Sequence, residues 1–430
     1  MSASVILLVS ACIYLAIGVP VAFALGLSTV TALVLGSSFP LLVVLKETFT
    51  GIDSFPLMAV PFFILAAELM SGGSLTEVLL RFASQFVGHK RGGLGYTTIA
   101  GLTFFSGISG SALADAAGPG SMMIRMMDKA GYDRAYAAAL TASTAIVGPI
   151  IPPSIIMIIY ALQDDNVSVG KLFVAGLVPG VLIALGMAVV NWHISRKRNY
   201  RGDGEHPGWS EILNTTVKAF PALLLPVLIL GGMRAGWFTP TEASVVAVFY
   251  ALVCGKFIYR TLEWKALPDI LARSALLTAS VLIIIATSAS FAWVLTIEGM
   301  PMKLAAWIAA QDLTPWMFLI IVNIFLLIFG IFIEPLPGVM VLVPILAPIA
   351  AKLGIDPIHF AMVVVFNLTL GMITPPVGGL LFVTSNVSKV PLAALTRELK
   401  PFLLAHLVIL IILTFVPALS TWLPTALGFK

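Results

Sequence analysis

The chain has 430 residues, of which 59% are hydrophobic and 10% are charged. Soluble domains average roughly 45–50% apolar and about 25% charged residues, so this composition excludes an ordinary water-soluble protein. The formal net charge of +4 is too small to indicate nucleic-acid binding. The two cysteines lie far apart inside apolar runs, which supports neither a disulfide framework nor a metal site.

The first apolar stretch, residues 4–45, is long enough for two membrane spans of roughly 20 residues each, with Gly18 and Pro20 marking a turn. It is too long for the apolar core of a cleavable signal. Further full-length apolar segments lie at 54–71, 134–162, 170–194, 219–238, 240–258, 274–297, 357–388 and 401–427. The sequence therefore predicts an all-α polytopic membrane protein with ten crossings.

Two more apolar regions, 94–128 and 314–351, are too long for one span and are interrupted in the middle by Gly, Ser and Pro. Each predicts a re-entrant hairpin that enters and leaves the membrane on one side. The stretches 74–88 and 300–311 precede the hairpins and carry apolar residues at helical spacing with few charges. They predict interfacial helices.

The orientation follows from the basic residues, which concentrate in short cytoplasmic loops. One side of the predicted layout receives His89, Lys90, Arg91, Lys129, Arg134, Arg196, Lys197, Arg198, Arg201, Lys218, Lys256, Arg260, Lys265, Arg273, Lys389, Arg397 and Lys400. The opposite side receives Asp164, Asp165, Glu298, Asp312 and Asp356, with Lys303 and Lys352 as exceptions. We therefore expect the polar segment 195–218 to be a cytoplasmic linker and both termini to lie outside the cytoplasm.

An internal repeat appears when the sequence is aligned with itself at an offset of 223. K-A-G-Y-D at 129–133 then falls on K-L-G-I-D at 352–356, and G-P-I-I-P-P at 148–153 on G-M-I-T-P-P at 371–376, with eight identities in 25 positions. The first hairpin opens to the cytoplasm and the second to the outside. Equivalent elements of opposite orientation form an inverted repeat, the architecture of many secondary transporters with a midplane site.

The chemistry is expected where the Pro-Pro pairs interrupt two spans, because proline inside a helix removes a backbone donor and clashes with the preceding turn. A broken helix leaves carbonyl groups without partners, which costs several kcal/mol each in hydrocarbon unless a cation, water or a neighbouring group satisfies them. The hairpin tips, S-G-I-S-G-S-A-L-A-D at 106–115 and G-I-F-I-E-P-L-P-G at 330–338, supply hydroxyls, carboxylates and flexible glycines. Sodium binding is the preferred interpretation, and a packing kink is the alternative. Asp115 and Glu334 near membrane depth favour a functional role.

Other function classes receive less support. The chain has no G-x-x-x-x-G-K-[ST] motif, which excludes ATP-driven transport by this chain itself. An intramembrane enzyme would need a catalytic site from residues without recognisable spacing, and a channel would need a continuous polar stripe. A proton-coupled transporter of the same fold remains the nearest alternative.

These residues resemble the large membrane subunit of tripartite ATP-independent periplasmic transporters, of the dicarboxylate and sialic-acid type. The resemblance covers essentially the whole chain. Its most specific parts are A-V-P-F-F-I-L-A-A at 59–67, S-G-I-S-G-S-A at 106–112, A-G-Y-D at 130–133, G-P-I-I-P-P-S at 148–154 and G-M-I-T-P-P-V-G at 371–378. The family implies a non-enzymatic, sodium-driven elevator in the bacterial inner membrane, without an organic cofactor.

The resemblance also assigns residues to ion sites in which each tip meets a broken helix. The first sodium site takes Ser109, Ser111, Gly148, Ile151 and Pro153. The second takes Gly330, Glu334, Gly371, Thr374 and Val377. Candidate substrate contacts are Ser106, Asp115, Pro152 and Pro375. The tip at 330–338 departs from the pattern because it carries no hydroxyl, so its site relies on backbone oxygens.

The expected domain division follows the repeat. Scaffold helices occupy 1–72, an interfacial arm 73–93, the first transport half 94–168, scaffold helices 169–273, a scaffold span and second arm 274–313, the second transport half 314–390 and a last scaffold span 391–430.

The family implies two protein partners, a separate small four-helix membrane subunit and a soluble periplasmic binding protein that delivers the substrate. Membrane lipid surrounds the chain. An organic acid is the expected substrate, with sialic acid preferred over a C4-dicarboxylate.

Overall fold

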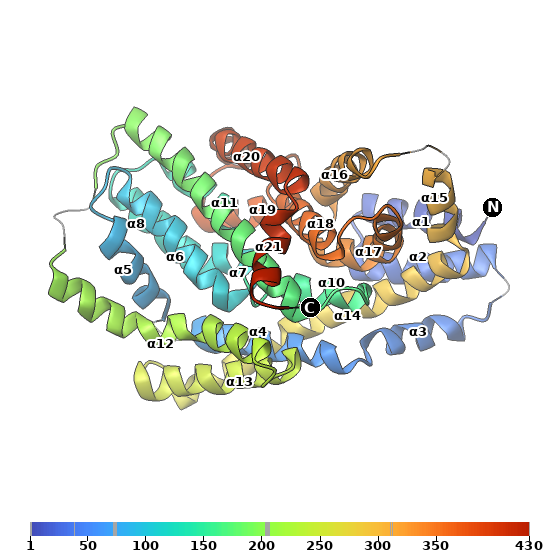
Figure 1. The fold of residues 1–430 in the computed structure, drawn as a ribbon, viewed down its shortest axis with the longest axis horizontal. Coiled ribbons are helices and arrows are strands. Elements are labelled where there is room, and N and C mark those ends of the chain that lie inside the picture. Colours follow the sequence, from blue (N-terminus) through green and yellow to red (C-terminus); the bar gives the residue numbers. More distant parts are fainter. Residues whose placement is uncertain are drawn as a thin grey trace.

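The computed structural model describes residues 2–37, 39–71, 75–202, 207–309, 311 and 313–429. The predicted domain boundary at 72–73, the centre of the predicted linker and Asp312 lie outside the described residues. Within these ranges the regular structure is entirely helical (Figure 1). Its α-helices are α1 (Ala3–Ala16), α2 (Val21–Gly36), α3 (Leu42–Ile52), α4 (Ala59–Ser71), α5 (Leu75–Val87), α6 (Gly93–Ser109), α7 (Ala112–Asp115), α8 (Ser121–Lys129), α9 (Arg134–Ala145), α10 (Ile155–Gln163), α11 (Val169–Lys197), α12 (Trp209–Arg234), α13 (Pro240–Val253), α14 (Leu267–Ile297), α15 (Met300–Ala309), α16 (Pro315–Phe332), α17 (Pro335–Lys352), α18 (Pro357–Gly371), α19 (Gly379–Ser388), α20 (Leu392–Phe415) and α21 (Ala418–Ala426).

The predicted number of ten crossings differs from what helix length supports. In the described part of the chain, seven helices are long and apolar enough to cross a membrane, or eight if a bent pair counts as one span. That pair joins Leu42–Ile52 to Phe55–Met70 at an angle of 62°. The difference arises because α1 and α2 are short, and because the Pro-Pro breaks divide 134–162 and 357–388 into helices of half a span.

The expected linker at 195–218 is shorter than the sequence indicated. Helix α11 continues to Lys197 and α12 already begins at Trp209. Both helices extend beyond their apolar segments, because polar residues such as lysine and arginine have helix propensities similar to those of apolar residues. The turn expected between the first two spans is present, with Gly18 at φ +87° and Pro20 directly before α2.

The internal repeat is visible in the helix boundaries themselves. Helices α9 and α18 begin 223 positions apart, as do α11 and α20, and α6 and α16 end 223 positions apart. The starts of α9 and α18 are also capped alike: Asp133 accepts a hydrogen bond of 2.8 Å from the Tyr136 N–H, and Asp356 accepts one of 3.0 Å from the His359 N–H. A side-chain cap of this kind satisfies a backbone donor that has no partner within the helix.

Helix α20 demonstrates that the two repeats run in opposite directions. Near its beginning, Glu398 accepts hydrogen bonds from Arg198, whose guanidinium lies 5.6 Å from the Tyr136 ring at the start of α9. Near its other end, the Thr414 carbonyl oxygen lies 3.2 Å from His359 Nε2 at the start of α18. The two broken helices therefore start at opposite ends of α20, as an inverted repeat requires.

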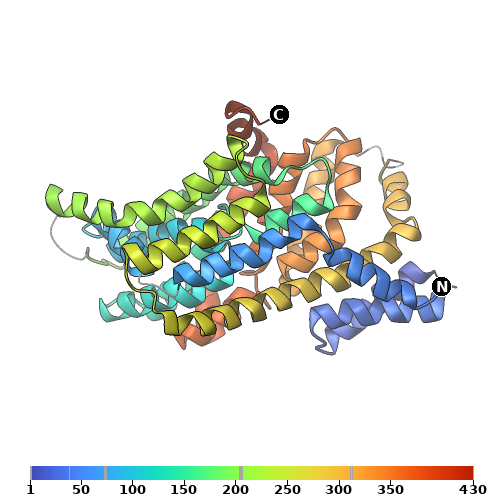
Figure 2. The ribbon, with the colours of Figure 1, turned by 90° about the horizontal axis from the view of Figure 1, so that it is seen from below.

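Helices α4, α12, α13 and α14 form a layer along one side of the molecule. Helix α13 packs against α4, α4 against α14, and α12 against α13, and Figure 2 shows them side by side. The repeat elements lie behind this layer in that view. Helix α5 connects the layer to the repeats, because it contacts both α12 and α6.

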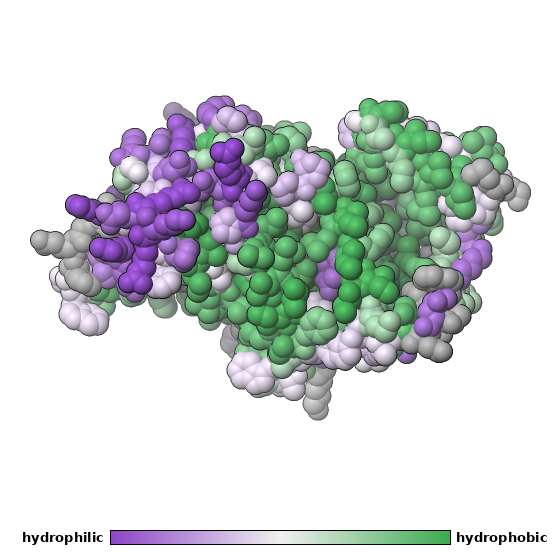
Figure 3. All heavy atoms as spheres, turned by 90° about the horizontal axis from the view of Figure 1, so that it is seen from above, coloured by the Kyte–Doolittle hydropathy of each residue, from purple (hydrophilic) through white to green (hydrophobic). Residues whose placement is uncertain are grey.

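Hydrophilic residues gather at one end of the molecule (Figure 3). This is the end at which α11 finishes and α12 begins (Figure 1). A broad apolar surface adjoins it in the same view, which is the distribution expected of a protein embedded in lipid.

The inverted topology predicts that Lys129→Cys and Lys352→Cys react with a membrane-impermeant maleimide from opposite sides. The two exposed lysines occupy equivalent repeat positions. Both variants are made in a protein that also carries Cys12→Ser and Cys254→Ala, so that the native thiols are removed. We expect labelling of Lys129→Cys only in inside-out vesicles and of Lys352→Cys only in intact spheroplasts. Labelling of both variants from the same side would contradict the inversion.

Candidate functional site

The tip of the first hairpin is a tight turn between α6 and α7. Gly110 adopts φ +61°, a left-handed conformation that glycine takes without steric cost. Its α-carbon also packs so close to the Pro153 carbonyl oxygen that a side chain there would overlap it. The next residue, Ser111, caps α7 by accepting a hydrogen bond of 3.4 Å from the Ala114 N–H. Glycine is therefore required where the tip meets the broken helix.

The first broken helix is interrupted between the end of α9 at Ala145 and the start of α10 at Ile155. The chain between them contains a cis peptide bond at Pro152-Pro153. A Cβ atom at Gly148 would lie 2.8 Å from Asp115 Oδ2 and 3.0 Å from the Ser111 carbonyl carbon. The backbone of the break thus lies directly against the hairpin tip.

A buried carboxylate lies where the tip of the first hairpin meets the first broken helix. We call this contact the first junction, and the equivalent contact in the other repeat the second junction. Asp115 has no exposed surface. Its Oδ2 lies 2.8 Å from Ser106 Oγ, and Ser109 Oγ donates a hydrogen bond to its Oδ1. None of the ion pairs among the described residues involves Asp115. An unpaired charge in such a place is costly, and a cation would compensate it.

The carbonyl groups of the break complete the arrangement. In the described part of the chain, the Pro149 carbonyl oxygen accepts a hydrogen bond of 2.6 Å from Ser154 Oγ, whereas none is recorded to the carbonyl oxygens of Gly148, Ile151 and Pro153. Backbone carbonyls buried in hydrocarbon need a partner. These three oxygens are consequently available to a ligand.

The second hairpin meets its broken helix in the same manner. Gly330 near the end of α16 touches Gly371 at the end of α18 so closely that a Cβ on Gly371 would overlap the Gly330 carbonyl group. Beyond the cis Pro375-Pro376 bond, the Gly378 N–H donates a hydrogen bond of 3.4 Å to the Ile331 carbonyl. The two repeats therefore bring tip and break together at equivalent places.

The second junction differs in its chemistry. Glu334 occupies the position equivalent to Ser111, and Gly338 the position equivalent to Asp115. The Thr374 hydroxyl donates a hydrogen bond of 2.9 Å to the Leu370 carbonyl. The carboxylate of this repeat thus belongs to an exposed residue before α17, not to a buried one within the hairpin.

The structure brings together most of the residues expected to bind ions. Ser109, Ser111, Gly148 and Pro153 meet at the first junction, and Ile151 lies behind it, 3.7 Å from a Cβ placed at Gly107. Gly330, Glu334, Gly371 and Thr374 surround the second junction, and Val377 precedes Gly378 there. The assignment of sodium to these residues stays a prediction.

A cavity of about 490 Å³ lies between the two hairpin tips and helices α4 and α14 of the layer. Its walls include Ser109 and Ser111 of the first tip, Glu334 of the second, and Pro149 and Met372 of the two breaks. Helices α4 and α14 close the other side, through Ile64, Ala67, Glu68, Leu277, Ser280, Val281 and Ile284. The cavity is thus bounded by both repeats and by two helices outside them.

The four residues expected to contact substrate do not line this cavity. Ser106 and Asp115 are buried behind the first tip, and Pro152 and Pro375 belong to the breaks. Their role in substrate binding stays a prediction. The α14 wall, whose residues recur at helical spacing around Ser280, could not be predicted from the sequence, because an apolar stripe in a span does not reveal what it faces.

Glu68 of α4 forms the polar part of the opposite wall. It accepts a hydrogen bond of 3.1 Å from Arg273 Nε at the beginning of α14. Among the described residues that line the cavity, Glu68 and Glu334 are acidic and none is basic.

Comparison with known proteins identifies the relatives of this chain. The sequence model of the family described as "Tripartite ATP-independent periplasmic transporter, DctM component" matches residues 8–419. The chain is 42% identical to the "C4-dicarboxylate TRAP transporter large permease protein DctM" of Pseudomonas aeruginosa, over 94% of this chain and 95% of that protein. It is 38% identical to the "Sialic acid TRAP transporter large permease protein SiaM" of Vibrio cholerae, over 95% of both chains.

A solved structure supports the fold. The YdaH transporter of Alcanivorax borkumensis superposes with a TM-score of 0.62 over 92% of this chain and 90% of that one, at 13% identity. At this identity the likeness concerns the fold alone. The long apolar helices and these relatives make the chain a multi-pass membrane protein of a transporter family.

The contact between tip and break predicts that Gly148→Ala destabilises the protein. The added methyl group would crowd Asp115 and the Ser111 backbone, and overpacking of this kind costs about 1–3 kcal/mol. Gly118→Ala is the matched control, because a Cβ there meets nothing within 4 Å. We expect a lower midpoint of thermal unfolding for Gly148→Ala and little change for Gly118→Ala. Equal midpoints would mean that tip and break are not in contact.

Proposed function

Because the chain belongs to the DctM component family of tripartite ATP-independent periplasmic transporters, we propose that it is a sodium-coupled permease for an organic acid. It operates in the bacterial inner membrane, with both termini on the periplasmic side. The observation that carries this proposal is the junction of a hairpin tip with a broken helix in each repeat. Each junction provides oxygen ligands at membrane depth.

Sodium suits the first junction for three reasons. The available ligands are the hydroxyls of Ser109 and Ser111 and the carbonyl oxygens of Gly148, Ile151 and Pro153. Oxygen atoms of this kind are the ligands that hard cations prefer. The neighbouring Asp115 carboxylate supplies a negative charge that a monovalent cation would balance.

A proton is the second candidate for the coupling ion. The specific observation in its favour is the same Asp115, which is buried, bonded to two serine side chains and free of a cationic partner within the described residues. A proton on Asp115 would remove the charge but would leave the three carbonyl oxygens of the break unpaired. Sodium is preferred because one ion satisfies both demands.

We propose that the substrate binds in the central cavity. The relatives from Pseudomonas aeruginosa and Vibrio cholerae are named for C4-dicarboxylates and for sialic acid, respectively, so both are candidates. The sequence identity of 42% to the dicarboxylate protein and 38% to the sialic-acid protein does not separate them. The part of the lining that the structure describes contains acidic and no basic side chains, so bound sodium would help to attract a carboxylate.

An elevator accounts for the division between layer and repeats. The hairpins and broken helices travel as one body, because pulling a tip from its break would expose unpaired carbonyls to lipid. Helices α4, α12, α13 and α14 stay in place, and α5 and α15 connect the two parts. Inverted repeats give the motion two end states of similar energy, since the halves exchange conformations.

We place α11 and α20 with the moving body, although the division expected from the sequence assigns them to the scaffold. Helix α11 packs against α9, α18 and α6, and α20 against α9, α18 and α19. Asn323 Nδ2 of α16 also donates a hydrogen bond of 3.0 Å to Thr414 Oγ1 of α20. Helices that contact both broken helices would obstruct the motion if they stayed behind.

The partners follow from the word tripartite in the family description. We propose that a periplasmic binding protein delivers the substrate and that a separate small membrane subunit packs on the fixed layer. Helices α12 and α13 offer exposed apolar side chains for that contact, among them Phe220, Val227 and Phe249.

The sodium assignment predicts that Ser109→Ala raises the sodium concentration needed for half-maximal uptake. Loss of one ligand oxygen from a buried cation costs about 1–3 kcal/mol, which corresponds to roughly 5–150-fold in affinity. Uptake is measured in liposomes that contain the chain and its partners, with sodium varied at constant ionic strength.

The control is Ser121→Ala in the same hairpin, whose hydroxyl donates a hydrogen bond to the Gly118 carbonyl away from the break. It should leave the sodium dependence unchanged. An unchanged sodium constant in Ser109→Ala would make Ser109 a packing residue. Uptake that follows a proton gradient without sodium would favour the second candidate ion.

The elevator predicts that a covalent link between tip and layer stops transport. Ala67 of α4 and Ala114 of α7 both line the cavity, so Ala67→Cys/Ala114→Cys joined by a bismaleimide should abolish uptake. The control lock is Asn323→Cys/Thr414→Cys, which joins α16 to α20 and should preserve most uptake if both helices move together.

Full uptake with the first lock closed would rule out the elevator and favour a rocking or local-gating mechanism. Loss of uptake with the control lock alone would return α20 to the scaffold.

A further inference from the structure

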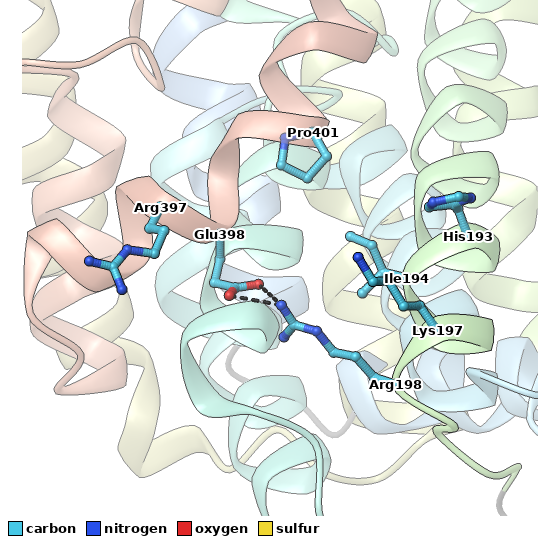
Figure 4. A pocket seen from close by; sticks show the side chains of 7 residues that line it. All are labelled: His193, Ile194, Lys197, Arg198, Arg397, Glu398 and Pro401. Atoms are coloured by element: carbon cyan, nitrogen blue, oxygen red, sulfur yellow. Dashed lines mark hydrogen bonds and ion pairs between the residues drawn. The ribbon is translucent and has the colours of Figure 1, made fainter.

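A second cavity, of about 400 Å³, opens at the hydrophilic end of the molecule between α11 and α20. It is lined by His193, Ile194, Lys197, Arg198, Arg397, Glu398 and Pro401 (Figure 4). None of these residues takes part in the junctions or in the central cavity. The transport function therefore leaves this cluster of charges unexplained.

The cluster carries more positive charge than its internal pairing requires. Arg198 donates hydrogen bonds of 2.8 and 2.7 Å to the two oxygens of Glu398, which neutralises both side chains. That hydrogen bond raises the pKa of Arg198, so the guanidinium stays charged. Lys197 and Arg397 form no ion pair among the described residues. In Figure 4 the guanidinium of Arg397 extends away from the Arg198–Glu398 pair.

The cavity lies where the membrane interface is expected. One turn from it, the Arg196 guanidinium lies 4.8 Å from the ring centroid of Trp192, which is half exposed. Tryptophan and arginine side chains are typical of the level of the lipid headgroups. The cavity therefore lies at the height of lipid phosphates.

Two exposed apolar stripes lead from the cavity toward the membrane centre. On α11 the stripe consists of Val181, Leu185 and Val189, and the same spacing continues to His193 and Lys197. On α20 it consists of Leu404, Val408 and Ile411, and continues in the other direction to Pro401 and Arg397. Residues three or four positions apart share one face of a helix. The alternating steps of three and four keep the α20 stripe on one face that ends at Arg397, whereas the steps of four on α11 turn gradually around the helix, so that Leu185 and Val189 adjoin His193.

The repeat provides an internal control for the fold. Each residue that lines the cavity has an equivalent in the other repeat, 223 positions away in the sequence. These equivalents lie near the opposite ends of α11 and α20. They are Val416, Pro417, Ser420, Thr421, Val174, Ala175 and Val178, and none of them is charged. The packing of these two helices consequently does not require the charged cluster. The excess of basic residues at one end follows the orientation of the chain, but orientation does not require three of them to line one cavity with Glu398.

We propose that this cavity binds a phosphate-bearing anion, supplied by the headgroup of an anionic membrane lipid whose acyl chains lie along the two stripes. Lys197 and Arg397 provide the free positive charge, and His193 precedes Lys197 by one helical turn on α11. Basic pockets between membrane helices are suited to such headgroups. The inference does not depend on the transported substrate or on the coupling ion.

Native mass spectrometry of the purified full-length chain in detergent tests this proposal. Phosphatidylglycerol and phosphatidylcholine are titrated separately, and inorganic phosphate is added in a third arm. We expect selective binding of phosphatidylglycerol. Lys197→Gln/Arg397→Gln should weaken it by about 30-fold, because each cation near a membrane surface contributes roughly fivefold.

Two further variants keep the test specific. Lys129→Gln/Lys265→Gln removes the same charge from exposed residues outside α11 and α20 that do not line the cavity, and should bind phosphatidylglycerol like the unchanged protein. Glu398→Gln frees Arg198 from its partner and should strengthen binding by about fivefold.

The outcomes separate the alternatives. Competition by inorganic phosphate with the same dependence on Lys197 and Arg397 supports the phosphate site and assigns it a soluble source. Equal loss of binding in both double variants would show a diffuse surface effect and overturn the proposal. Equal affinity for phosphatidylglycerol and phosphatidylcholine, or no binding of any probe, would overturn it as well.

Discussion

The fold depends on one constraint, that a backbone group cannot stay unpaired in hydrocarbon. Two helices of this chain are interrupted at Pro-Pro pairs inside the protein, where interrupted hydrogen bonding costs several kcal/mol for each unpaired group. The tips of the two hairpins lie against these interruptions, at Gly110 with Pro153 and at Gly330 with Gly371. The glycines at these contacts, the serines near them and the buried Asp115 all follow from the need to close the breaks without filling them.

The inverted repeat explains why the molecule contains two such junctions and why they differ. Helix α20 extends from the start of one broken helix to the start of the other. Residues of both junctions line the central cavity. Only the first has hydroxyls on its hairpin tip and a buried carboxylate, whereas the second has the Thr374 hydroxyl in its break and the exposed Glu334 on its tip. We infer that the first junction binds its ion more tightly, because more of its ligands are side-chain oxygens with a nearby negative charge.

Much of this arrangement could be predicted from the sequence, because its signals are local. The Pro-Pro pairs, the glycines of the hairpin tips and the internal repeat at a gapless offset of 223 can be recognised from the amino-acid sequence alone. The helix ends within the predicted linker were not visible in the sequence, because α11 continues past its apolar residues to Lys197. The contact of Ser106 with Asp115, the wall around Ser280 and the packing of α20 on α9 and α18 depend on tertiary neighbours. Periodicity reveals a helix face but not its partner.

The central claim is that sodium occupies the junctions of tips and breaks. The most direct measurement is the thermal unfolding of the purified chain, without partners or substrate, in sodium chloride and in choline chloride of equal ionic strength. A ligand that binds only the folded protein stabilises it by about 2.7 kcal/mol at one hundred times its dissociation constant. The account predicts a midpoint that rises with sodium and not with choline. A midpoint that is the same in both salts would contradict it.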